Sequence, residues 1–271
     1  MIQANKTLGQ HFLANKGIIE KIILAAGLTK EDTVLEIGPG LGALTFELSK
    51  RAERVIAVEK DEKLAGALKE KLMEQKIDNV EVIADDILKL FDLGSMFHVL
   101  CFKVVANIPY YLTSHLIRLL LELENKPENI ILMIQKEVAQ RICATDKKES
   151  LLSISVKFYA DPKILFYVSK GSFLPPPKID SAVIEITPKK SPAPIEPDKF
   201  FAIIKAGFSA PKKMLINNLA KKFDIDKSQL AIIFRTIDIS CEIRAGKLSL
   251  NQWVQLANSI NLLKSDFHRL K

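Results

Sequence analysis

Cysteine and long apolar runs are scarce in this 271-residue chain, and each scarcity excludes a class of protein. The three cysteines (Cys101, Cys143 and Cys241) are scattered and form no CxxC pair, which argues against a disulfide framework. We therefore expect reduced cysteines in the protein core. No apolar run approaches the roughly 18–20 residues that a membrane-spanning helix needs. The first residues carry no apolar stretch of signal-peptide type, so we expect a cytoplasmic protein without a membrane segment.

Histidine is also rare, and its spacing does not suit a metal site. The four histidines lie far apart in the sequence, at positions 11, 98, 115 and 268. We therefore expect no metal ion. Hydrophobic residues make up 48% of the chain and charged residues 26%, which is ordinary for a folded globular protein. The length suits a large domain with a smaller second one, and we expect a monomer.

The positive charge of the chain is concentrated in its last third. The net charge is +7. Residues 1–187 carry 24 lysines and arginines against 25 acidic residues, whereas residues 188–271 carry 15 against 7. This excess indicates an acidic partner for the C-terminal part, most simply nucleic acid. The alternative is a solvated basic surface that keeps the protein soluble.

A proline-rich segment divides the sequence into two parts. Four of the twelve prolines fall within residues 188–197, and proline both removes backbone donors and blocks regular structure. We interpret this segment as a linker between a domain at 1–187 and a domain at 198–271. After the linker, helical periodicity over 200–208, 214–223, 228–235 and 250–262 predicts a small helical bundle. Ser249 is a suitable N-cap for the last helix.

Before the linker, short apolar runs alternate with helical patterns. We expect strands at 33–37, 54–59, 80–84, 99–106, 130–134, 163–169 and 181–187. Runs of this kind suit strands that are buried on both faces of a parallel sheet. The last two follow one another without a helix, which fits antiparallel closure of one sheet edge. The pattern predicts a doubly wound, Rossmann-like α/β sheet of seven strands.

A glycine-rich turn follows the first expected strand, where open α/β sheets bind their ligands. Gly38 and Gly40 allow the tight turn and let a ligand approach the backbone. The second strand ends in Glu59, whose carboxylate can accept both hydroxyls of a ribose. The third ends in Asp85, which can accept from an adenine amino group. By themselves the glycines also satisfy the dinucleotide fingerprint, so the motif is at this point also compatible with a nicotinamide-dependent enzyme.

The sharpest motif is Asn107-Ile108-Pro109-Tyr110, at the end of the fourth strand. It supplies an amide oxygen, a backbone carbonyl and an aromatic face. Two acceptors on an exocyclic amine favour the pyramidal geometry that a nucleophilic nitrogen needs. Stacking of the base on Tyr110 is worth roughly 1–3 kcal/mol. A nicotinamide enzyme has no use for this motif, and a plain turn is the alternative reading.

These motifs resemble those of the rRNA adenine N6-dimethyltransferases over nearly the whole chain. Besides the glycine turn and the Asn107 motif, the matching segments are 8–13, 135–138 with Arg141, and the proline-rich loop 173–183. The last two are highly specific to the family. The best match is its small-subunit branch, which implies N6,N6-dimethylation of two adjacent adenosines near the 3′ end of 16S rRNA. The resemblance also implies a Rossmann-like methyltransferase fold and S-adenosylmethionine as the cofactor.

The resemblance further implies roles for individual residues. It places His11, Leu13, Gly38, Gly40, Glu59, Asp85 and Asn107 at the cofactor. Asn107 also contacts the target amine, and Tyr110 and Phe173 are candidates to clamp the flipped adenine. Phe173 has an alternative role as a core residue that anchors the proline-rich loop. In the helical domain, Lys212, Lys213, Lys221 and Lys222 are candidates to contact RNA phosphates, with a solvated helical face as the alternative.

Three departures from the family pattern bear on these roles. His11 replaces a frequent asparagine, and lysines at 212 and 213 replace a stretch that is usually richer in arginine. Residues 149–152 replace a more usual Tyr-Gly. Two other functions stay open: methylation of an adenine in 23S rRNA, as in the related antibiotic-resistance enzymes, and a non-catalytic RNA-binding assembly factor on the same fold.

Overall fold

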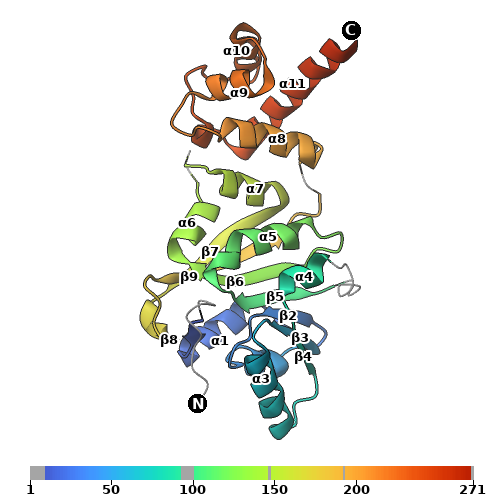
Figure 1. Ribbon diagram of the computed structural model, residues 1–271, viewed down its shortest axis with the longest axis vertical. Coiled ribbons are helices and arrows are strands. Elements are labelled where there is room, and N and C mark those ends of the chain that lie inside the picture. The colour runs from blue at the N-terminus through green and yellow to red at the C-terminus, as the bar shows by residue number, and fades with distance from the viewer. Residues whose placement is uncertain (1–9, 93–100, 146–147, 192, 270–271) are drawn as a thin grey trace. The chain divides into compact units, whose positions relative to one another are not determined.

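The computed structural model describes residues 10–92, 101–145, 148–191 and 193–269 (Figure 1). The chain divides into two compact units. Unit 1 contains the chain up to Gln140 together with Asp161–Pro188. Unit 2 contains Arg141–Ala160 and the chain from Lys189 onward.

Unit 1 is built on a seven-stranded mixed sheet with the strand order β4-β3-β2-β5-β6-β9-β7. In that order the strands are Val80–Ala84, Arg54–Glu59, Thr33–Ile37, Lys103–Asn107, Asn129–Gln135, Ser181–Pro188 and Ala160–Val168. The pairs from β4 to β6 are parallel, and β9 runs antiparallel to β6. The expected fold class is confirmed. Of the fourth expected strand, residues 99 and 100 lie outside the described residues.

The central strands are apolar on both faces because helices cover both. Consecutive residues such as Val34 and Leu35, or Val104 and Val105, are at most 1% exposed. Figure 1 shows α1 and α3 on one side of the sheet and α4 and α5 on the other. The helices of unit 1 are α1 (Lys16–Ala25), α2 (Thr45–Ser49), α3 (Glu62–Glu74), α4 (Ile87–Asp92), α5 (Thr113–Glu122) and the first part of α6 (Lys136–Ile142).

Parallel pairing brings the carboxyl ends of β2, β3 and β5 to one edge of the sheet. Ile37 lies opposite Val58 in the register of β2 and β3, and Leu35 lies opposite Val104 of β5. A separate two-stranded ribbon pairs β1 (Phe12–Leu13) antiparallel to β8 (Phe173–Leu174). Short 3-10 turns, η2 (Tyr110–Leu112) and η3 (Lys170–Ser172), flank these strand ends.

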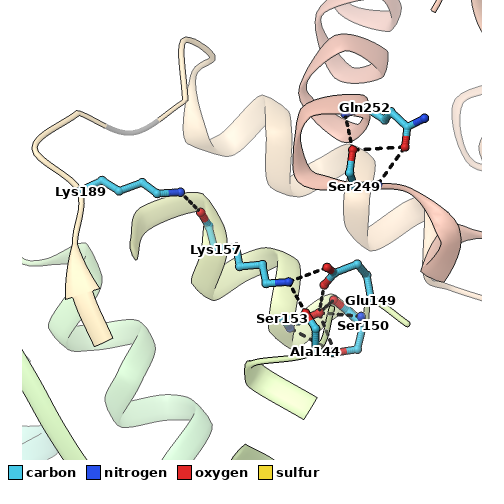
Figure 2. Close-up of polar contacts among 8 residues, drawn as sticks. All are labelled: Ala144, Glu149, Ser150, Ser153, Lys157, Lys189, Ser249 and Gln252. Carbon is cyan, nitrogen blue, oxygen red and sulfur yellow. Dashed lines mark hydrogen bonds and ion pairs between the residues drawn. The ribbon is translucent and has the colours of Figure 1, made fainter. Parts of the chain in front are cut away.

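Unit 2 is helical. It contains α7 (Leu151–Tyr159), α8 (Pro197–Gly207), α9 (Leu215–Phe223), α10 (Lys227–Thr236), η4 (Ala245–Lys247) and α11 (Leu250–Arg269). The four helices expected after residue 197 are present. The expected N-cap is confirmed as well, because Ser249 Oγ accepts from Gln252 N and Gln252 Oε1 accepts from Ser249 N (Figure 2).

The division between the units differs from the sequence-based boundary at residues 141–160, which the sequence analysis placed in the first domain. Their helix α7 packs against α8 and α11. The ring of Phe158 stacks on that of Phe200 at 4.5 Å, and both side chains are fully buried. The sequence analysis named no helix between the strands at 130–134 and 163–169, and the apolar face of α7 is covered by helices that follow residue 197 in the sequence.

The unusual segment at 149–152 forms the N-terminus of α7. Ser150 caps the helix by accepting from Ser153 N, and Ser153 Oγ accepts from Ser150 N in return (Figure 2). Glu149 pairs with Lys157 at 2.5 Å, and the same ammonium donates to the carbonyl of Ala144. Ser150 and Glu149 therefore cap and anchor the first turn of α7.

The expectation that the cysteines are core residues is wrong. All three are free thiols, but Cys101 is exposed and the other two are half-buried. Cys101 precedes β5, so it does not lie on a buried face of the sheet. Within the described residues, no group of three or more His, Cys, Asp or Glu side chains could hold a metal ion, and no helix is long and apolar enough to cross a membrane.

Candidate active site

The conformation of the glycine turn after β2 depends on two left-handed glycines and on one buried carboxylate. Gly38 and Gly40 have φ angles of +70° and +57°, which glycine adopts without strain. Gly40 N donates to Glu59 Oε2 at 3.0 Å, and Gly38 N donates to the carbonyl of Val58 at 2.9 Å. The end of β3 therefore fixes the shape of the turn.

Glu59 is almost completely buried, and both of its oxygens are engaged. Besides the bond from Gly40, Oε1 accepts from Asp61 N at 3.0 Å. Burial raises the pKa of Glu59, and the two backbone amide donors oppose that rise. Each carboxylate oxygen has a second lone pair, so the group can still accept a ligand hydroxyl.

Glu36, one strand away, is a second buried acid in the same cavity. It is 1% exposed, and its Oε2 has no hydrogen-bond partner. Burial raises the pKa of Glu36 to about 8, and the nearby charge of Glu59 adds to the rise. The sequence analysis did not single out this residue as a candidate. The signal that could have singled it out is an acid within the apolar run of β2.

Asn107 at the end of β5 presents an acceptor to the cavity. Its Nδ2 donates to the carbonyl of His11 at 3.4 Å. Its Oδ1 makes no hydrogen bond to any residue that the structure describes. Pinning one end of the amide in this way leaves the oxygen available as an acceptor for an incoming N–H group.

Tyr110 follows in η2 and forms an aromatic wall. Its hydroxyl and Ser181 Oγ share a hydrogen bond of 2.9 Å, and Ser181 is fully buried. The rings of Tyr110 and His11 are stacked at 6.2 Å with an interplanar angle of 28°. Burial raises the pKa of the Tyr110 phenol, so the group is neutral at physiological pH.

The N-terminal segment is tied to the proline-rich loop beside this wall. His11 Nδ1 lies 2.8 Å from the carbonyl oxygen of Pro175, and because a carbonyl can only accept, this nitrogen carries the proton. The β1–β8 ribbon continues the connection, with Ala14 N donating to the carbonyl of Ser172 at 2.9 Å. Sequence reasoning identified both segments but gave no sign that they pair.

The structure brings most of the sequence-predicted site residues together around one cavity of about 220 Å³. The predicted residues that line it are His11, Leu13, Gly38, Gly40, Glu59, Asn107 and Tyr110. Glu36, Tyr111 and Leu174 also line it and were not predicted. Asp85 is not among the lining residues; it directly follows β4, and its backbone N donates to the carbonyl of Glu59 at 3.0 Å.

Phe173 is not among the lining residues. It is 2% exposed and belongs to the core cluster that contains Leu13 and Ile131. Side chains alternate between the two faces of a strand, so in β8 Phe173 points into the core while Leu174 points outward with 64% exposure. The alternative that Phe173 anchors the proline-rich loop matches this placement, and the clamp position does not.

The donor set fits S-adenosylmethionine. The cavity combines a glycine turn for close backbone approach, a buried carboxylate for a ribose and an orphaned buried carboxylate oxygen on Glu36. The cofactor carries a cationic sulfonium and an ammonium group, which an acidic cavity favours electrostatically. The four candidate RNA-contacting lysines lie elsewhere, on unit 2, and all four are exposed, at positions 212, 213, 221 and 222.

The chain has extensive sequence likeness to characterised proteins. A family model described as "Ribosomal RNA adenine dimethylase" matches residues 1–262. "Ribosomal RNA small subunit methyltransferase A" of Dehalococcoides mccartyi is 41% identical over 257 residues, covering 94% of this chain and 88% of the relative. The protein of the same name from Bacillus pumilus is 41% identical over 266 residues, covering 93% and 90%.

Solved structures agree with this result. A dimethyladenosine transferase from Plasmodium falciparum matches with a TM-score of 0.80 at 29% identity, covering 93% of this chain and 98% of that one. The 23S rRNA methyltransferase ErmE matches with a TM-score of 0.74 at 25% identity, covering 92% and 99%. Together these likenesses confirm the predictions of an rRNA adenine dimethyltransferase that uses S-adenosylmethionine. The chain belongs to the ribosomal RNA adenine dimethylase family.

Proposed function

We propose that this chain dimethylates N6 of two adjacent adenosines near the 3′ end of 16S rRNA in the small ribosomal subunit or its precursor. The observation that carries the proposal is Asn107, which lines the same cavity as the glycine turn and whose Oδ1 accepts from no residue in the described part of the chain. The 41% identical relatives named as small-subunit methyltransferases support the choice of 16S rRNA.

S-adenosylmethionine supplies an electrophilic methyl group on a sulfonium. Several residues of this chain hold it in our proposal. Glu59 accepts the ribose hydroxyls, and Asp85 accepts from the adenine amine. Gly38 and Gly40 would hold its methionine part, and His11 and Leu13 would contact it from the N-terminal segment.

The target adenine leaves its stack to reach the cavity. There Asn107 Oδ1 and the carbonyl of Ile108 accept its two N6–H bonds, and the Tyr110 ring stacks on the base. The nitrogen lone pair forms the new N–C bond as the C–S bond breaks. The product cation then loses its proton to water, so no strong base is needed. Catalysis comes mainly from proximity and orientation.

RNA binding involves the basic unit 2 in this proposal, with phosphate contacts from Lys212, Lys213, Lys221 and Lys222. All four side chains are exposed, as such contacts require. We further propose that the protein acts as a monomer in the cytoplasm, where its ribosomal substrate is found.

Methylation of 23S rRNA is the competing function, because ErmE shares the fold. Its lower identity of 25% makes that substrate the weaker choice. The discriminating experiment incubates the purified protein with tritiated S-adenosylmethionine and separated, unmethylated 30S and 50S particles. Label in 30S rRNA alone, mapped by mass spectrometry to two adjacent dimethyladenosines, is the expected result. Label in 50S particles supports the 23S alternative, and no label with retained RNA binding supports a non-catalytic assembly factor.

A further inference from the structure

A second concave site lies on unit 1, outside the cofactor cavity. It has a volume of about 490 Å³ and is lined by Lys136, Glu137, Gln140, Lys170, Lys178, Ile179 and Asp180. Its lysines come from three separate segments: the start of α6, the turn η3 and the loop before β9. We call Lys136, Lys170 and Lys178 the lysine site.

The ammonium groups of the lysine site are free to bind an anion. None of the three forms an ion pair with a residue in the described part of the chain. Lys170 and Lys178 are exposed. Lys136 is half-buried, with its Nζ held 5.1 Å from the centre of the Tyr167 ring.

Backbone hydrogen bonds centred on Asp180 hold the segments together. Lys136 N donates to the carbonyl of Asp180 at 3.1 Å, and Lys170 N donates to Asp180 Oδ1 at 3.0 Å. The carboxylate of Asp180 is thus engaged within the fold. Glu137 is exposed at the rim, and with both acids counted the site still has an excess of positive charge.

The lysine site adjoins the aromatic wall of the catalytic cavity. Asp180 precedes Ser181, the residue that holds the Tyr110 hydroxyl, and consecutive Cα atoms are only about 3.8 Å apart. One step along the chain thus links the lysine site to the residue that holds Tyr110, the ring on which the target base stacks in the proposed function. Lysine binds phosphate as a point charge and needs no fixed fork geometry.

We propose that Lys136, Lys170 and Lys178 bind phosphates of single-stranded RNA that flank the target adenosine. The inference rests on the proposed function, since it takes the Tyr110 cavity as the adenine site. It adds an RNA contact on the catalytic unit, where acidic and basic residues are otherwise nearly balanced. Unit 2 then provides affinity for the rRNA as a whole, and the lysine site places the strand at the cavity.

The test compares two triple variants of the full chain. In the first, the lysine site is changed by Lys136→Gln, Lys170→Gln and Lys178→Gln. The matched control removes the same charge from exposed positions on α1 and α3 by Lys21→Gln, Lys69→Gln and Lys71→Gln. Binding to a fluorescein-labelled rRNA hairpin with two adjacent unpaired adenosines is measured by anisotropy over a range of salt concentrations. Calorimetric titration with S-adenosylmethionine checks that both variants fold.

Each phosphate contact on a single strand contributes about 0.7 to the slope of log affinity against log salt, so the first variant should lose about 2 from that slope. At low salt its Kd should rise at least tenfold over that of the control. Equal slopes and affinities in the two variants would overturn the lysine site and leave methylation of 30S particles, and hence the proposed function, intact. If the salt dependence of RNA affinity needs the three lysines but the protein methylates no rRNA, the phosphate contact is supported and the proposed methyltransferase function is refuted. Failure of the unaltered chain to bind the hairpin would overturn the lysine site alone, because the proposed function is tested separately on 30S particles.

Discussion

The hydroxyl of Tyr110 lies 2.9 Å from Oγ of Ser181, joining the turn after β5 to the first residue of β9 across the intervening strand β6. This bond sets the rotation of the aromatic ring that faces the proposed adenine site. Ser181→Ala removes it. Because a hydrogen bond of this kind is worth about 1 kcal/mol, we expect kcat for rRNA methylation to fall about fivefold, with unchanged affinity for S-adenosylmethionine.

A double-mutant cycle separates this effect from a general loss of packing. Tyr110→Phe deletes the other partner and should reduce kcat by a similar factor. If the serine acts through the tyrosine, adding Ser181→Ala to Tyr110→Phe should cause little further loss. A full second fivefold loss in the double variant would show that the two residues act independently.

Asn107 is the residue on which methyl transfer depends most directly in our proposal. Asn107→Ala deletes the amide oxygen that accepts from the target amine but leaves the glycine turn and Glu59 in place. We expect methyl transfer to 30S rRNA to fall about a hundredfold, the typical effect of losing one preorganised polar group at a reacting centre. Single-turnover assays measure this loss, and calorimetry with S-adenosylmethionine should show retained binding. Full activity in this variant would refute the assigned role.

The sequence predicted the sheet well because its strands carry strong local signals. The apolar runs of β2, β3 and β6 are each bounded by turn residues. A strand that is buried on both faces can be recognised from its own apolar run, without knowing which strands pair with it. The cavity was predictable for a related reason. Parallel strands end at one edge, so Gly38, Glu59 and Asn107 had to meet there once the fold class was known.

Features that depend on pairing between distant segments were not predictable. Phe173 follows a turn in sequence, and nothing local indicates that pairing with β1 directs it into the core. The Ser181 partner of Tyr110 lies 71 residues away. Likewise, α7 carries an ordinary apolar face, and its packing against α8 and α11, which follow the linker in the sequence, decides which unit it joins.

The buried acid Glu36 should make folding stability depend on pH. Burial raises its pKa to about 8 from an ordinary value of 4.5. Between these values the folded state holds a proton that the unfolded state releases, so the contribution of Glu36 to the free energy of unfolding falls as pH rises from about 5 to 8. The decrease is at most about 1.4 kcal/mol per pH unit. Chemical denaturation of the wild type and Glu36→Gln at four pH values should show a shallower dependence in the variant.

Glu20→Gln, at an exposed position of α1, controls for the loss of one negative charge. Its free energy of unfolding should depend on pH as that of the wild type does.

A second measurement tests Glu36 through cofactor binding. The cationic cofactor should favour the ionised form of Glu36, so its binding should release protons near pH 7. Calorimetry in two buffers of different ionisation enthalpy measures that release. No difference between the wild type and Glu36→Gln would contradict the role of this acid.

We expect cofactor binding to require glycine at position 40 because it has no side chain, and not only because of its backbone conformation. Its φ of +57° makes alanine cost roughly 1–2 kcal/mol of stability. A Cβ there would also lie 3.1 Å from two ring carbons of Phe12 and so push against the cavity wall.

Gly27 is a matched control, since its φ of +53° imposes the same backbone cost while a Cβ meets nothing within 4 Å. We therefore expect both Gly40→Ala and Gly27→Ala to lose stability in thermal denaturation, with the larger loss at Gly40 because of the added contact with Phe12. Only Gly40→Ala should weaken S-adenosylmethionine binding, by at least tenfold in calorimetry, because its methyl group displaces Phe12 toward the ligand. Equal cofactor affinity in the two variants would mean that the turn tolerates a side chain and that the cofactor lies elsewhere.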